Sequence, residues 1–183
     1  IAKSATQRAA FRNYGGTRWG KGLKQAIHIP GIGDLSERER PIYAGLAGEC
    51  AVADVINRRL RMTVAEVDLK NRTYGDGGVD LKVLGARLQV KTRQSHDRRS
   101  LIRATDERGN STLPDVHAYV FCEWLGGELV SVLGWLNARF VVDRPRRPGK
   151  GEWMNVEVID TELEPMSAMI EGFKKRLLQG AKA

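Results

Sequence analysis

Apolar residues recur at helical spacing in the first third of the chain. Intervals of three, four and seven residues place them on one face of a helix. Ser36, followed three positions later by Glu39, has the form of a capping box at the start of this segment. We therefore predict a helix from about Ser36 to about Arg61. Its apolar stripe is formed by Ile42, Leu46, Ala53, Ile56 and Leu60.

A second pattern has a period of two. Residues 78–92 read GVDLKVLGARLQVKT, which predicts a β-hairpin that turns near Gly85. A tight two-residue turn makes paired positions add to an odd number, so Asp80 falls opposite position 89 or 91. Side chains alternate across a strand. One face then carries the polar Asp80, Lys82, Gln89 and Lys91, and the other carries the apolar Val79, Leu81, Val83, Leu88 and Val90.

The remaining pattern indicates further strands and a closing helix. VHAYVFCEW (116–124) and ELVSVLGWL (128–136) are predicted to pair around a Gly126-Gly127 turn, and MNVEVI (154–159) is a further predicted strand. Pro165 suits the first turn of a helix that runs to about Gln179. We interpret the polar residues 93–114 as a loop or broken helix and RPRRPGKG (144–151) as a loop.

The simplest assembly is one α/β domain, residues 36–183, with a mixed sheet flanked by helices. A basic, glycine-rich arm of residues 1–35 precedes it. The chain of 183 residues contains no apolar run near the roughly 18–20 residues that span a bilayer. Its start has no signal-peptide pattern. Cys50 and Cys122 are far apart, which favours reduced, buried cysteines in a cytoplasmic protein with no membrane partner.

The charge of the chain indicates the class of partner that it binds. The net charge is +8, and a basic balance of this size favours a polyanionic partner. Any single cluster of basic residues is more simply a solvated loop, but three clusters in one small chain favour nucleic acid. Besides the arm, the candidate contacts are Arg93, Arg98 and Arg99, and Arg144, Arg146, Arg147 and Lys150.

The polar hairpin face has the chemistry of a metal site. Asp80 and Gln89 are predicted to lie close enough to offer oxygens to one hard cation such as Mg²⁺, and the carbonyl of Val90 is a further ligand if the strand is distorted. Lys91 is near enough to position a metal-bound water. Glu49 lies on the apolar stripe of the predicted helix, which is costly unless the carboxylate is paired with an arginine or near a metal.

A helix bearing Glu49, then GDGGVD (75–80), then QVK (89–91) resembles the PD-(D/E)xK nuclease superfamily, over roughly residues 36–92. Residues 116–136 are similar to its later strands. The resemblance implies a restriction-endonuclease-like core with Mg²⁺ at Asp80 and Gln89, Glu49 completing the site, and Lys91 acting on the attacking water. Asp or Glu is usual in the family where this chain has Gln89. In this respect the chain resembles the QxK variant found in Mrr-type nucleases. An amide brings no charge, so a single metal is expected.

Neighbouring residues carry weaker signals. Asp76 could add a third carboxylate, but a turn Asp more often binds its own backbone. Tyr74 could touch substrate or simply pack. Residues 92–95 could meet phosphates or form a solvated loop, and His96 is expected to be an exposed loop residue.

These observations predict a Mg²⁺-dependent DNA endonuclease, with Mn²⁺ as a substitute and no small-molecule cofactor. It is expected to be structure-directed or weakly sequence-specific. One site per chain means that cutting both strands needs a homodimer or two events. Two alternatives stay open, a catalytically inactive nucleic-acid-binding module on the same fold, which Gln89 favours, and an RNA-processing nuclease.

Overall fold

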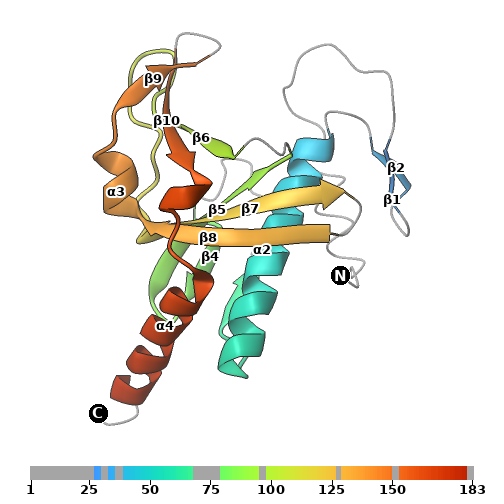
Figure 1. Cartoon of the computed structure of the whole chain (residues 1–183), viewed down its shortest axis with the longest axis vertical. Coiled ribbons are helices and arrows are strands. Elements are labelled where there is room, and N and C mark those ends of the chain that lie inside the picture. The colour runs from blue at the N-terminus through green and yellow to red at the C-terminus, as the bar shows by residue number, and fades with distance from the viewer. Residues whose placement is uncertain are drawn as a thin grey trace.

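The computed structural model describes residues 27–29, 33–35, 39–67, 79–94, 98–126, 129–149 and 153–180. These segments form a mixed α/β structure in which helices flank a mixed central sheet, as the sequence predicts (Figure 1). None of the described helices is long and apolar enough to span a bilayer.

The central sheet has five strands in the order β3-β4-β5-β7-β8. Only β5 and β7 are parallel, and the other neighbours are antiparallel. The predicted partners 116–124 and 128–136 are confirmed as β7 and β8. The strands are β3 (Ala65–Val67), β4 (Leu81–Val83), β5 (Ala86–Arg93), β7 (Ala118–Gly126) and β8 (Leu129–Asn137).

Helices α2 (Glu39–Leu60) and α4 (Met166–Gly180) cover one face of this sheet. Both helices were predicted, and the ends of each agree with the prediction to within a few residues. Ser36 lies outside the described residues, so the predicted cap stays a prediction. The apolar positions of α2 and α4 pack with inward residues of β4, β5 and β7 in one core. That core includes Val52 and Ile56 from α2, Leu81, Leu88 and Val120 from the strands, and Ile170 and Phe173 from α4.

The opposite face of the central sheet is covered by a second, three-stranded antiparallel sheet in the order β6-β10-β9. β10 has the predicted bounds, but it belongs to this second sheet. The expectation of a loop or broken helix over 93–114 is wrong because β6 lies within it, and β9 interrupts the predicted loop 144–151. The strands are β6 (Arg99–Arg103), β9 (Arg146–Pro148) and β10 (Met154–Ile159).

The second core lies between the two sheets. It joins Tyr119 and Phe121 of β7 to Ile102 of β6 and Val156 of β10, and helix α3 (Ala138–Val142) adds Val141. Val79 packs against this core and not with the other apolar residues of the hairpin, which is a correction to its predicted face. The reason is that the regular strand begins only at Leu81, so the alternation does not extend back to residue 79.

Two short strands, β1 (Ile27–Ile29) and β2 (Gly33–Leu35), pair antiparallel within the predicted arm. Leu35 is buried against Tyr43 and Trp124 in a third small core. Neither Cys50 nor Cys122 forms a disulfide, as predicted. Cys122 is fully buried, which raises its pKa to about 12, but the prediction that Cys50 is buried is wrong, because it is only half-buried.

Candidate active site

The hairpin that carries the predicted site turns tightly at Leu84 and Gly85. Both residues have positive φ, 47° and 79°, as a two-residue type I′ hairpin turn requires. Pairing of Leu81 with Leu88 and of Val83 with Ala86 gives the odd-number parity that the sequence predicts. Asp80 immediately precedes this paired stretch, and it meets β5 through its own hydrogen bonds.

Asp80 joins the open end of the hairpin to β5. Its Oδ2 accepts hydrogen bonds from Gln89 Nε2 at 2.5 Å and from the Val90 backbone N–H at 2.6 Å. Its own N–H donates to Leu88 O at 2.9 Å. Gln89 is only 6% exposed, so this contact is shielded from water. The structure therefore brings together Asp80, Gln89 and Val90, three of the four predicted metal ligands.

The donor set of this junction is compatible with Mg²⁺. The ion prefers oxygen ligands, is often bound through one or two carboxylates, and keeps several waters. Asp80 supplies a carboxylate, and Gln89 supplies an amide oxygen if its side-chain amide turns so that the oxygen, in place of Nε2, faces Asp80. Among the described residues, no three His, Cys, Asp or Glu side chains form a metal-binding group. The junction alone thus offers one formal negative charge.

Glu49, the fourth predicted metal ligand, lies in α2. Steps of four residues put Glu49, Ala53 and Asn57 on one stripe of the helix. Asn57 binds the backbone of β3 at Ala65, and Ala53 is buried beside the hairpin, so the stripe runs towards the start of β4. Glu49 lies on the same stripe, one helical turn before Ala53.

A close helix–strand contact supports this placement. A Cβ on Gly48 would lie 1.9 Å from Thr92 Oγ1, so the backbone of α2 nearly touches β5 there. Glu49 is the next residue. Glu49 therefore belongs to the helix layer next to Thr92, whereas Asp80 contacts Gln89 and Val90 from the start of β4.

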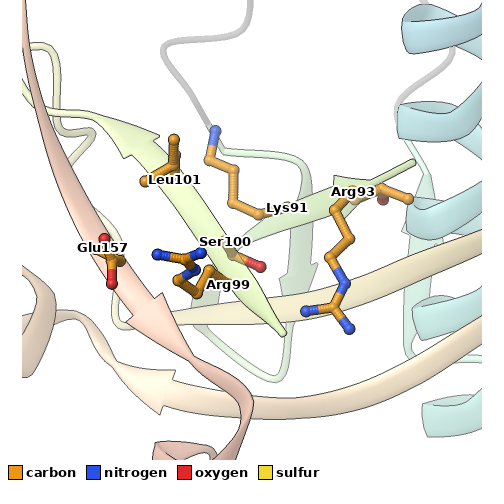
Figure 2. Close-up of a pocket in the computed structure, with 7 residues that line it drawn as sticks. Lys91, Arg93, Arg99, Ser100, Leu101 and Glu157 are labelled. Atoms are coloured by element: carbon orange, nitrogen blue, oxygen red, sulfur yellow. The ribbon is translucent and has the colours of Figure 1, made fainter. Parts of the chain in front are cut away.

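Lys91 lines a pocket of about 470 Å³ between β5 and the second sheet. Figure 2 shows Lys91 and Arg93 leaving β5 in different directions, with Arg99 and Leu101 of β6 and Glu157 of β10 around the same pocket. Val90 packs in the helix-side core, so Lys91 lies on the other face with Gln89. The predicted lysine thus stands beside an open, charged pocket large enough for a small ligand.

Arg93, predicted to contact DNA, instead holds the two sheets together. Its guanidinium donates to Asp160 at 2.6 and 2.8 Å and to Glu123 at 2.9 Å, with a side chain only 9% exposed. The hydrogen bond to Asp160, helped by that to Glu123, raises the pKa of Arg93 against the opposing effect of burial. The guanidinium of Arg93 is therefore engaged within the protein.

The other basic residues predicted to contact DNA fall into two groups, those paired within the protein and those that are exposed. Arg144 is engaged within the protein, with Glu157 O and with Glu162, and Arg147 is exposed but paired with Glu157 at 3.2 Å. Exposed basic residues are Arg98, Arg99 and Arg146. Lys150 lies outside the described residues, as do Tyr74, Asp76, Ser95, His96 and the basic arm before residue 27.

Sequence reasoning missed the partners of Arg93. Glu123 offered a signal, because it is a carboxylate within the apolar run VHAYVFCEW and is 9% exposed. Asp160 follows β10 in the 3-10 helix η1 (Asp160–Glu162) and carries no local signal of its role.

A scan of protein-family models found no family that matches this chain, and searches of curated proteins and of solved structures found no match either.

Proposed function

We propose that the protein is a metal-dependent DNA endonuclease of the PD-(D/E)xK kind, built on a restriction-endonuclease-like core. The observation that carries the proposal is the junction at the start of β4. There Asp80 contacts Gln89 and Val90, and Lys91 follows in the strand beside a pocket. Glu49 lies in α2 next to Gly48, which packs against Thr92 of the same strand. Apart from Gly48 and Thr92, these are the residues through which the sequence resembles that superfamily.

In the proposed site, Asp80 and Gln89 hold the cation and Glu49 adds charge to its surroundings. Mg²⁺ or Mn²⁺ bound there would neutralise charge on the scissile phosphate and make a bound water more acidic. Lys91 orients the attacking water with an N–H and stabilises the negative charge that develops on the phosphate oxygens. Exposed arginines hold the DNA backbone, largely without regard to sequence.

Replacement of Gln89 by Glu tests the metal part of the proposal without an activity assay. Two carboxylates at this junction repel each other in the absence of a cation and share one in its presence. We expect Gln89→Glu to unfold at a lower temperature than wild type in EDTA and to gain more than wild type from Mg²⁺. If Mg²⁺ raises the unfolding temperature of wild type and of Gln89→Glu by the same amount, that result would argue against a cation at this junction.

The alternative of a catalytically inactive binding module is favoured by one observation, the amide of Gln89 donating to Asp80, because such a pair holds the strand end without any metal. A panel of single-stranded, duplex and branched DNA and of RNA, each with Mg²⁺, Mn²⁺ or EDTA, separates the candidates. Metal-dependent cutting of DNA that is lost in Asp80→Ala supports the endonuclease. Salt-sensitive binding without cutting selects the inactive module, and cutting of RNA alone selects the RNA-processing nuclease.

A further inference from the structure

The solvent-facing side of the sheet β6-β10-β9 combines arginines with exposed apolar side chains. In β6 the outward positions alternate with buried ones, and the pairing of Asn155 with Arg103 and with Arg147 aligns the three strands. We call this side the outer face. It comprises Arg99, Leu101, Arg103, Arg147, Trp153, Asn155, Glu157 and Ile159.

The charge of the outer face suits a polyanion. Arg99 and Arg103 lie four residues apart on one strand, which is about 13 Å, and Arg147 stands across β10 from them. Three arginines face a single carboxylate, Glu157, which is bonded to Arg147. The outer face therefore has a positive excess that could contact successive phosphates.

Arg103 is held in the geometry of a phosphate-binding group. Its guanidinium lies over the Trp153 ring, 4.7 Å from the ring centroid, and its Nε donates to Thr105 O at 3.0 Å. The residue is nevertheless exposed. A stacked guanidinium fixed at one edge presents a rigid plane of donors, so less side-chain entropy is lost when it binds a phosphate.

Apolar groups between the arginines favour a strand with unpaired bases. Leu101 stands between Arg99 and Arg103 and is 62% exposed, and Ile159 is 38% exposed. In a duplex, the faces of the bases are stacked inside and only their edges reach the grooves. In a single strand, the base faces can lie on apolar and aromatic side chains while the backbone meets the cations.

The outer face leads into the pocket beside the proposed catalytic lysine. Arg99, Leu101 and Glu157 belong both to the outer face and to the lining of the pocket, which Lys91 also lines (Figure 2). A strand that lies along β6 would thus lie next to the pocket that Lys91 lines.

We infer that the outer face binds an unpaired DNA strand and guides its backbone to the pocket at Lys91. The guiding role rests on the proposed endonuclease function, and it makes the substrate a DNA with a single-stranded segment, such as a flap or a junction. The binding itself does not depend on cleavage, so the two can be tested apart.

The test is fluorescence anisotropy with a labelled single-stranded DNA, the duplex of the same sequence and the matching RNA, in EDTA, over a series of salt concentrations. The variants are Arg99→Gln, Arg103→Gln and Leu101→Ser. The control is Arg58→Gln, which removes an exposed arginine from α2, in the layer on the opposite face of the central sheet. Thermal unfolding of each variant verifies that these exposed substitutions leave the fold intact.

We expect wild type to bind the single strand more tightly than the duplex. Each arginine variant should bind roughly tenfold more weakly, from loss of one charge-assisted contact, with a salt dependence about 0.7 less steep. Leu101→Ser should bind roughly three- to tenfold more weakly at an unchanged salt dependence. Arg58→Gln should bind like wild type.

Equal or tighter binding of the duplex, or arginine variants that bind like Arg58→Gln, would overturn the inference, and tenfold tighter binding of RNA would overturn its assignment to DNA. If the outer-face variants lose binding but wild type cuts nothing with Mg²⁺ or Mn²⁺, the binding surface stands and the endonuclease fails. If wild type cuts and these variants bind and cut normally, the binding surface alone fails.

Discussion

Replacing Arg93 by Met tests whether this residue joins the two sheets or contacts DNA. The side chains of Arg93, Glu123 and Asp160 are 9%, 11% and 24% exposed, and the guanidinium bonds to both carboxylates. Removing one partner of a buried ion pair costs about 3–5 kcal/mol, because the charge left behind stays desolvated. Since Asp160 is partly exposed, we expect the lower end, about 3 kcal/mol.

Urea unfolding measures this loss. With a slope of about 2 kcal/mol per molar for a small domain, the midpoint should fall by about 1.5 M at pH 7. The control is Arg98→Met, an exposed arginine five residues away, which should change stability by less than about 0.5 kcal/mol.

A loss below about 1 kcal/mol for Arg93→Met would refute the reasoning, because removing a buried guanidinium from two carboxylates should cost more than that. A variant of unchanged stability with weakened DNA binding would instead restore the original prediction of a phosphate contact. Adding Glu123→Met to Arg93→Met should recover part of the lost stability, since it removes one of the two carboxylates that face the guanidinium in wild type.

Two further predictions concern the helix–strand contact and the dependence on pH. Gly48→Ala should lower the free energy of unfolding by about 1–3 kcal/mol, because its Cβ would lie 1.9 Å from Thr92 Oγ1; Thr92→Ala should restore most of the loss, and an unchanged urea midpoint would contradict the contact. The hydrogen bond from Arg144 lowers the pKa of Glu162, so this stabilisation is complete above the ordinary value of 4.5 and is lost as the pH falls through the lowered value. Below pH 4.5 the thermal unfolding temperature should therefore fall more steeply in wild type than in Arg144→Gln, and equal slopes would show that the pair contributes nothing.

The hairpin was predictable because its structure is local. The tight turn at Gly85 fixes the register, and the register predicts that Asp80 lies near Gln89, where their hydrogen bond is found. Helices α2 and α4 were predictable for a similar reason, since their apolar spacing and terminal residues lie within each segment. What alternation could not show is which way the amide of Gln89 points, because that depends on hydrogen bonds formed only in the fold.

The second sheet was missed because its pairing is distant in the sequence. In β6, Arg99, Leu101 and Arg103 point outward and Ser100 and Ile102 point inward. Only one of the two inward residues is apolar, so the short sequence gives no clear strand signal without its pairing to β10. The partners of Arg93 lie 30 and 67 residues away in the sequence. Without them, a basic residue two positions after Lys91 is predicted to face solvent or DNA. Long-range ion pairs of this kind leave no periodic signal in one sequence.

The most direct test of the proposed activity is the rate at which the full chain cuts a flap DNA with Mg²⁺ or Mn²⁺, for wild type, Lys91→Ala and Lys82→Ala. Lys82 is an exposed lysine of the same hairpin, paired across it with Arg87 and absent from the pocket. We predict that wild type and Lys82→Ala cut at equal rates and that Lys91→Ala is slower by at least about a hundredfold. Cutting by Lys91→Ala at the wild-type rate, or no cutting by wild type with either metal, would contradict the proposed endonuclease.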